Sequence, residues 1–187
     1  MRLKPETRIL GIDDASFSRG DKDVLVVGVV YRGPYWIDGL VSTRIEVDGL
    51  DATDRIADMV HLSKYGDLRV LMFSGVTIGG FNIVDIRALH EKTGLPVIVV
   101  IDRRPDLEKI FKAVQNVSDS ERRIEMMQRA GQVFHAQGGI YFQVCGIEPG
   151  TARALIRKTS VHSLIPEPLR VSHIIASGIS NGESTKR

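Results

Sequence analysis

The chain has 187 residues, of which 43% are hydrophobic, so we expect residues 1–187 to form one compact domain with the polar segment 181–187 as a flexible tail. The formal net charge of +2 neither requires nor excludes a nucleic-acid partner. The single cysteine, Cys145, excludes an intrachain disulfide and favours the reducing cytoplasm, and no apolar run reaches the roughly 18 residues of a membrane span.

Three strands are predicted at the start of the chain. Residues 7–13 and 23–33 are apolar runs, and 35–47 ends in an alternation of apolar and polar residues. Short turns between these segments predict an antiparallel meander. The period changes at 51–64, where apolar residues recur at helical spacing.

Strands and helices alternate through the rest of the chain. Pro105 in a first turn and a Ser118…Glu121 capping box predict two helix starts, and Gly94 predicts a helix end. The expected strands are 68–75, 95–102 and 138–147, and the expected helices are 81–94, 105–117, 118–134, 148–160 and 166–180.

This order predicts an α/β fold with a mixed sheet, in which a three-strand antiparallel meander is followed by βα units. We expect parallel pairing on the other side of the sheet and helices on both faces. In such a sheet, ligands bind beyond the carboxyl ends of the parallel strands. Acidic residues at those ends are therefore the first candidates for a site.

The stretch "GIDDASF" places Asp13 and Asp14 at the end of the first strand. Successive strand residues point to opposite faces, so the two carboxylates cannot share one cleft unless the strand has already ended. Locally, "DDAS" also reads as an ordinary turn. Asp51, with another acid three residues later, has the layout of a helix N-cap, and Asp48 precedes a glycine as turn residues do.

Two loops at strand ends have the composition of ligand-binding loops. The loop after 68–75 contains Gly75, Gly79 and Gly80, which would let its backbone approach a ligand closely, but it lacks the Gly-Lys-Ser/Thr of a P-loop. Arg103 and Arg104 follow the strand 95–102 and would suit a phosphate, although a solvated turn is the simpler interpretation.

Several blocks together resemble an archaeal family catalogued as domain of unknown function ninety-nine, and the resemblance covers roughly residues 7–183. The blocks are "GIDDASF", "STRIEVDGLDATD", "LMFSGVTIGGFNIVDI", "GLPVIVVIDRRPDLEKI" and "IPEPLRVSHIIASG". That family is similar to endonuclease V, a Mg²⁺-dependent nuclease that cuts near deaminated bases. The resemblance implies a ribonuclease H-like fold, the same element order that the sequence pattern predicts.

The endonuclease V pattern has an acid on the first strand, at the first helix and at the end of the fourth strand. The first matches Asp13. The second matches Asp51, with Asp48 as the fallback. The third falls on Ser74, because the chain reads "FSG" where an acid and a glycine are expected. A serine hydroxyl is a much poorer metal ligand than a carboxylate.

Two further positions complete the comparison with endonuclease V. The basic residue after the fifth strand falls on Arg103, or on Arg104 if the loop shifts by one. The late histidine of the family falls on Leu169, and His173 lies four residues later, about one helical turn away.

The resemblance implies a divalent-metal-dependent nuclease-like protein acting on DNA or RNA, with Mg²⁺ or Mn²⁺ as cofactor. Ser74 favours an alternative, a non-catalytic nucleic-acid-binding or regulatory module on a degenerated nuclease scaffold. A third alternative is an aspartyl-nucleophile phosphatase or phosphotransferase, but the chain lacks the partner lysine that such an enzyme needs in a matching context. The implied residues are Asp13, Asp51 and Arg103 for catalysis, Asp13, Asp51 and Asp48 for the metal, and Gly75, Gly79, Gly80, Arg104 and Arg170 for nucleic acid.

Overall fold

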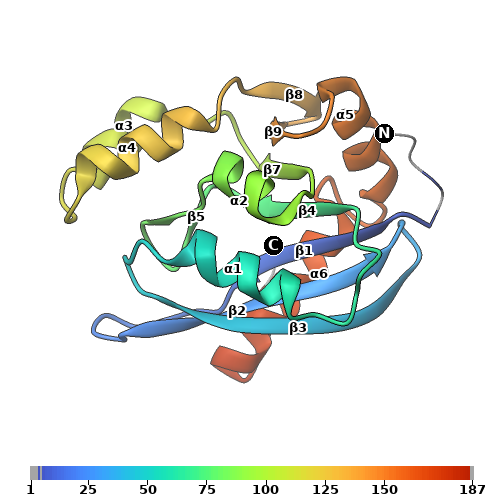
Figure 1. Cartoon of the computed structure of the whole chain (residues 1–187), viewed down its shortest axis with the longest axis horizontal. Helices are drawn as coiled ribbons and strands as arrows, with labels where there is room; N and C mark the ends of the chain where they lie inside the picture. The colour runs from blue at the N-terminus through green and yellow to red at the C-terminus, as the bar shows by residue number, and fades with distance from the viewer. Residues whose placement is uncertain (1–3, 5, 186–187) are drawn as a thin grey trace.

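The computed structural model of the chain describes residues 4 and 6–185. In this part, seven strands form one mixed sheet in the order β3-β2-β1-β4-β7-β9-β8, with helices on both faces (Figure 1). The sheet strands are β1 (Arg8–Asp14), β2 (Asp23–Arg32), β3 (Trp36–Glu46), β4 (Val70–Ser74), β7 (Val97–Ile101), β8 (Phe134–Gln137) and β9 (Ile140–Cys145). A separate hairpin consists of β5 (Thr77–Ile78) and β6 (Asn82–Ile83).

The meander β1–β2–β3 is antiparallel, as expected, and β1, β4 and β7 are parallel to one another. The other side of the sheet differs from the prediction, because β9 runs antiparallel to β7 and pairs with β8 as a hairpin. The chain enters β9 from this hairpin rather than from a crossover helix, which reverses the strand direction. The parallel strands therefore lie in the middle of the sheet.

The helices are α1 (Ala52–His61), α2 (Ile86–Thr93), α3 (Leu107–Val114), α4 (Ser120–Arg129), α5 (Pro149–Thr159) and α6 (Glu167–Asn181). Alternate residues of β1 face different helices. Leu10 and Ile12 belong to a cluster that contains residues of α1 and α2, whereas Ile9 clusters with residues of α5 and α6. A Cβ added at Gly11 would lie 2.3 Å from the backbone of Pro168. Glycine at this position therefore lets α6 lie directly against β1.

Four predicted helix boundaries are wrong in detail. The helix expected over 81–94 begins only at Ile86, because 82–83 form β6. Pro105 precedes the N-cap, Asp106, instead of lying in the first turn of α3. The Ser118…Glu121 capping box does not form, because the N-cap of α4 is Asp119, with φ of 53° and no side-chain cap bond. The helix expected over 118–134 ends at Arg129, and the following residues form β8.

Among the described residues, no helix is long and apolar enough to cross a membrane. The segment expected as a flexible tail, 181–187, is described only as far as Thr185, and 186–187 lie outside the described residues. The Thr185 backbone N–H donates to the Ser177 hydroxyl at 3.2 Å. Residues 182–185 thus return along α6 toward its middle.

Candidate functional site

Asp13 and Asp14 lie at the carboxyl end of β1, and their side chains point to opposite faces of the sheet, as the strand alternation predicts. The Asp13 carboxylate Oδ2 lies 2.9 Å from Nδ1 of His173 on α6. Nε2 of the same ring lies 3.0 Å from the Thr185 hydroxyl. The side chain of Asp13 is only 11% exposed. A largely buried carboxylate thus orients a histidine through one ring nitrogen.

Ser74 lies beside Asp13, at the end of the neighbouring parallel strand. Ile12 pairs with Phe73, so the register brings the next residue of each strand level. Gly75 follows with φ of 90°, a conformation that favours glycine, and its N–H donates to Val100 O at 3.0 Å. The structure therefore places the serine where the endonuclease V pattern has its third acid.

Asp14 faces the hairpin β5–β6, where its Oδ2 accepts the Gly79 N–H at 2.9 Å. Burial and the adjacent charge of Asp13 raise the pKa of the Asp14 carboxyl to about 6, and the Gly79 N–H only partly opposes them. The charge of Asp13 thus disfavours the ionised form of Asp14, although the two side chains point to opposite faces of the sheet.

The carboxylate of Asp48 also binds the β5–β6 turn. Its Oδ1 accepts the Phe81 N–H at 2.8 Å, and its own N–H donates to Gly79 O at 2.9 Å. Asp48 has φ of 53°. A Cβ at Gly80 would lie 2.3 Å from the Asp48 Oδ1, so glycine is needed there by packing as well as by its φ of 82°. In this structure, the Asp48 carboxylate therefore holds the β5–β6 turn in place.

Asp51 is the N-cap residue of α1, as predicted, but its side chain makes no cap hydrogen bond. Its carboxylate instead accepts from Asn82 Nδ2 at 2.7 Å and from the Glu46 N–H at 3.1 Å, and it pairs with Arg55 at 3.3 Å. The Oδ1 of Asn82 accepts the Ala52 N–H at 3.1 Å. Asn82, which is fully buried, thus satisfies the helix terminus and holds Asp51.

The side chain of Arg123 ties these loops to α4, and sequence reasoning did not find it. Its guanidinium donates to the backbone carbonyls of Asp48 at 2.6 Å, Gly49 at 2.8 Å, Phe81 at 2.5 Å and Ser118 at 2.7 Å. Arg123 is 1% exposed. A planar cation with five donors matches such a set of carbonyls. Arg123 therefore fixes the relative position of the β3–α1 turn and the β5–β6 turn.

The three arginines expected at the site lie in different settings. Arg103 and Arg104 are exposed after β7, and Arg103 pairs with Asp102 at 3.7 Å. Arg170 lies on α6, where its guanidinium donates to Glu167 at 2.6, 3.0 and 3.1 Å. Arg170 is thus committed to an internal ion pair, whereas the other two cations point into solvent at the carboxyl side of the sheet.

Within residues 4 and 6–185, no group of three or more His, Cys, Asp or Glu side chains could hold a metal ion. The structure brings Asp13 together with His173 on one face, and Asp14 with Asp48 around the hairpin on the other. Leu169, where the family pattern places its histidine, is fully buried in the core. The signal for His173 was its position one helical turn later on α6.

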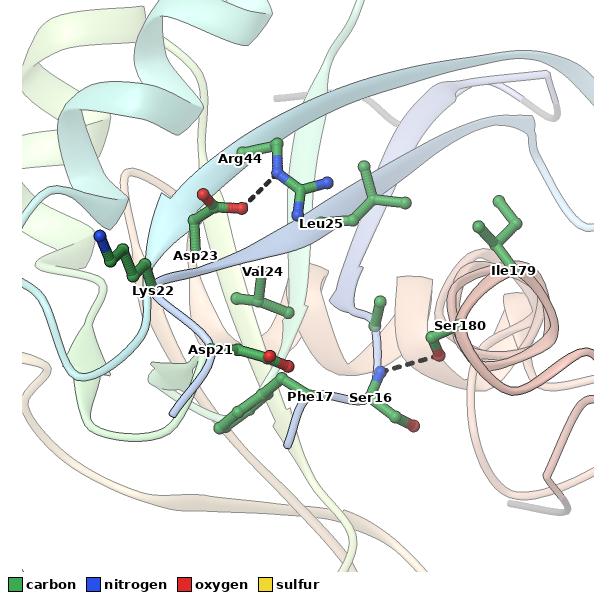
Figure 2. A pocket seen from close by; sticks show the side chains of 11 residues that line it. Ser16, Phe17, Asp21, Lys22, Asp23, Val24, Leu25, Arg44, Ile179 and Ser180 are labelled. Atoms are coloured by element: carbon green, nitrogen blue, oxygen red, sulfur yellow. Dashed lines mark hydrogen bonds and ion pairs between the residues drawn. The ribbon is translucent and has the colours of Figure 1, made fainter. Parts of the chain in front are cut away.

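A pocket of about 380 Å³ begins next to this site. Its lining includes Ser16 and Phe17, just after β1, together with the start of β2 and the last turn of α6 (Figure 2). The Ser16 N–H donates to the Ser180 hydroxyl at 3.1 Å and joins the two segments. The pocket thus adjoins the end of the strand that carries Asp13.

The fold is that of endonuclease V, a ribonuclease H-like fold. Endonuclease V from Ciona intestinalis, solved with a 24mer DNA containing an inosine followed by a ribo-adenosine, has a TM-score of 0.60 and 12% identity. The similarity covers 95% of this chain and 85% of that one. At this identity, the likeness concerns the fold alone.

Residues 5–180 match the model of the family described as Endonuclease dU, and the chain belongs to that family. A UPF0215 protein of Methanopyrus kandleri is 49% identical over 189 residues, which cover 98% of this chain and 96% of the relative. The crystal structure of a protein of unknown function from Archaeoglobus fulgidus is 40% identical, with a TM-score of 0.86 over 93% of this chain and 98% of that one.

Proposed function

We propose that the protein is a divalent-metal-dependent nuclease that hydrolyses phosphodiester bonds of DNA or RNA in the cytoplasm. The observation that carries the proposal is the 2.9 Å pairing of Asp13 with His173 at the carboxyl end of β1, on an endonuclease V-like scaffold. Ligands of open α/β sheets bind at such strand ends. The Endonuclease dU description of the family favours deoxyuridine-containing DNA as the first substrate to test.

The donors at the site fit Mg²⁺ or Mn²⁺ held jointly by protein, water and substrate phosphate. Mg²⁺ usually keeps several waters and takes only one or two protein carboxylates. Asp13 would be the first of these. Asp51, the second candidate from the sequence, is held by Asn82 on the α1 side of the sheet, whereas Asp13 meets His173 on the α6 side. The bound cation would supply Lewis-acid stabilisation of the phosphate and a more acidic water.

The residues around this position have distinct proposed roles. His173 keeps the Asp13 carboxylate in place through Nδ1, and its Nε2 can exchange a proton with a substrate or water once Thr185 gives up that nitrogen. The exposed cations Arg103 and Arg104 would contact backbone phosphates. Gly75, Gly79 and Gly80 would let the nucleic-acid strand approach the loop backbone closely.

A specific observation favours a second candidate, a nucleic-acid-binding or regulatory module without catalysis. Ser74 stands beside Asp13 where the endonuclease V pattern has an acid. A site with fewer charged ligands could retain the nucleic-acid surface and lose the metal.

One set of assays separates the two candidates. Labelled DNA and RNA strands, with and without uracil or inosine, are incubated with Mg²⁺ or Mn²⁺ and the wild type, Asp13→Asn or Asp58→Asn. Asp58 is an exposed acid on α1 and serves as the matched control. We expect wild type and Asp58→Asn to cleave, and Asp13→Asn to lose at least about 100-fold in rate, as loss of a metal ligand implies.

The other outcomes are equally informative. Equal cleavage by Asp13→Asn would indicate a contaminant and contradict the nuclease. Binding without cleavage by any variant, together with no Mg²⁺ or Mn²⁺ uptake in calorimetry, would establish the non-catalytic module instead.

A further inference from the structure

The pocket that we call the α6-end pocket adjoins the chain segment just after the proposed cleavage position. It is lined by Ser16, Phe17, Leu25, Arg44, Ile179 and Ser180, among others. Ser16 is three residues past Asp13 along the chain, and the last turn of α6 lies about two helical turns beyond His173. A strand whose phosphate sits at Asp13 would therefore reach the pocket with an adjacent nucleotide.

Part of the lining of the α6-end pocket is apolar and open to solvent. Phe17 is 38% exposed and Ile179 is 62% exposed, high values for large apolar side chains. Leu25 forms part of the floor on β2 (Figure 2). The volume of about 380 Å³ falls in the range of roughly 300–1,000 Å³ typical of small-molecule sites. An aromatic ring with aliphatic neighbours in such a pocket is suited to a planar base.

The rim of the same pocket carries cations and hydrogen-bonding groups. Lys22 and Arg44 line it, and Arg44 lies opposite Leu25 in the pairing of β2 with β3. Asp23 also lines the pocket, but it forms an ion pair with Arg44, which offsets its charge (Figure 2). The hydroxyl of Ser180 adds a group that can donate or accept. Asp21 lines the pocket as well, so a phosphate next to a stacked base would meet Lys22 and Arg44 beside two carboxylates, of which Asp23 is paired with Arg44.

We infer that the α6-end pocket binds an unpaired base of the substrate strand, stacked on Phe17, with its phosphate beside Arg44. The inference rests on the proposed nuclease function, because it says where the nucleic-acid substrate continues beyond the cleavage position. It concerns a base next to the scissile phosphate and adds a binding site to the proposed catalytic one.

The test uses single-stranded DNA with one uracil and 2-aminopurine at successive neighbouring positions, in EDTA so that no cleavage is needed. We expect quenched 2-aminopurine fluorescence at one position with wild type. Phe17→Ala should lose the quenching and roughly ten-fold in affinity, in line with the alanine cost of base stacking. Trp36→Ala is the matched control, because Trp36 is an aromatic residue 48% exposed on β3, outside the pocket lining.

Phe17→Leu separates stacking from simple apolar contact. This variant keeps an apolar side chain, and we expect it to lose most of the quenching. Full quenching with leucine would overturn the stacking assignment, as would equal affinities of Phe17→Ala and Trp36→Ala.

The rim gives an independent arm of the test. Arg44→Gln should weaken binding and reduce its salt dependence, whereas Asp23→Asn should strengthen binding by releasing Arg44 from its ion pair. No change in either variant would overturn the assigned phosphate contact. If wild type cleaves and the Phe17 and Arg44 variants bind unchanged, this inference alone is refuted. If wild type neither binds a strand in EDTA nor cleaves one with Mg²⁺ or Mn²⁺, the proposed function is refuted too.

Discussion

Arg170 stabilises the fold through a nearly buried carboxylate, and removing it should be costly. Glu167 is 1% exposed and accepts three hydrogen bonds from the Arg170 guanidinium, at 2.6, 3.0 and 3.1 Å. The His162 N–H adds a weaker bond at 3.2 Å. In Arg170→Ala, the buried carboxylate keeps only its contacts with His162, to the backbone N–H and to the ring Nδ1, both at 3.2 Å.

The magnitude follows from breaking one side of a buried pair, which typically costs about 3–5 kcal/mol. Arg170 itself is 27% exposed, so solvent can replace part of its interaction, and we expect the lower end, about 3 kcal/mol, at neutral pH. Burial alone would raise the pKa of Glu167, but the bonds from Arg170 and His162 outweigh it and lower that pKa below its usual value.

The sign of the pH dependence follows from these shifts. A lowered folded-state pKa gives wild type a stabilisation that is present above the unfolded pKa and is lost as pH falls through the folded one. In Arg170→Ala, burial dominates and raises the pKa of Glu167, so the variant loses stability as pH rises. The difference between the two proteins should therefore grow from about pH 4 to about pH 7.

Denaturant unfolding of both proteins across this pH range measures the difference. Arg69→Ala is the control, since Arg69 is exposed, and it should change stability by no more than about 0.5 kcal/mol. A loss that is the same at both ends of the range, or below about 1 kcal/mol at neutral pH, would refute the reasoning from the buried pair.

Other substitutions test further contacts by the same unfolding measurement. The pKa of Asp14 is raised to about 6, so wild type should lose about 2 kcal/mol of stability as pH rises from 4 to 6 in metal-free buffer. Asp14→Asn, whose carbonyl can still accept the Gly79 N–H, should not lose it, and parallel curves would contradict this. Arg123→Met leaves several buried carbonyls without a donor, and it should lower the free energy of unfolding by at least about 3 kcal/mol. A change under about 1 kcal/mol would show that Arg123 does not hold the two turns together. Gly11→Ala pushes a methyl group to 2.3 Å from Pro168 and should cost about 1–3 kcal/mol or more; unchanged stability would show that α6 can shift.

Much of the sheet could be predicted from the sequence, because strand and helix periods are local properties. The apolar runs correctly placed the meander and the central strands, and period-two alternation put Asp13 and Asp14 on opposite faces. The strand β8 was missed because it is short and at the sheet edge, where Ala136 alone is fully buried. The two-residue strands β5 and β6 are too short to show any period.

The contacts of the candidate site could not be predicted in this way. Asp13 and His173 are 160 positions apart, and they meet only because Gly11 admits α6 against β1. Asp51 fitted the pattern of an N-cap, yet Asn82 makes the bond to the helix terminus. Such choices depend on which partners the tertiary structure brings within reach, and no local spacing encodes them.

The helices α3 and α4 project from the sheet as an arm (Figure 1). The arm shares a small apolar cluster, centred on Ile83, Val114 and Met127, with the β5–β6 hairpin, and Arg123 joins it to the site loops. A unit with so little apolar burial can open without global unfolding. We expect amide hydrogens of α3 and α4 to exchange at a lower free energy than those of β1 and β4. Each such opening would release the carbonyls of Asp48 and Phe81, so the local stability of α3 and α4 limits the order of the site loops.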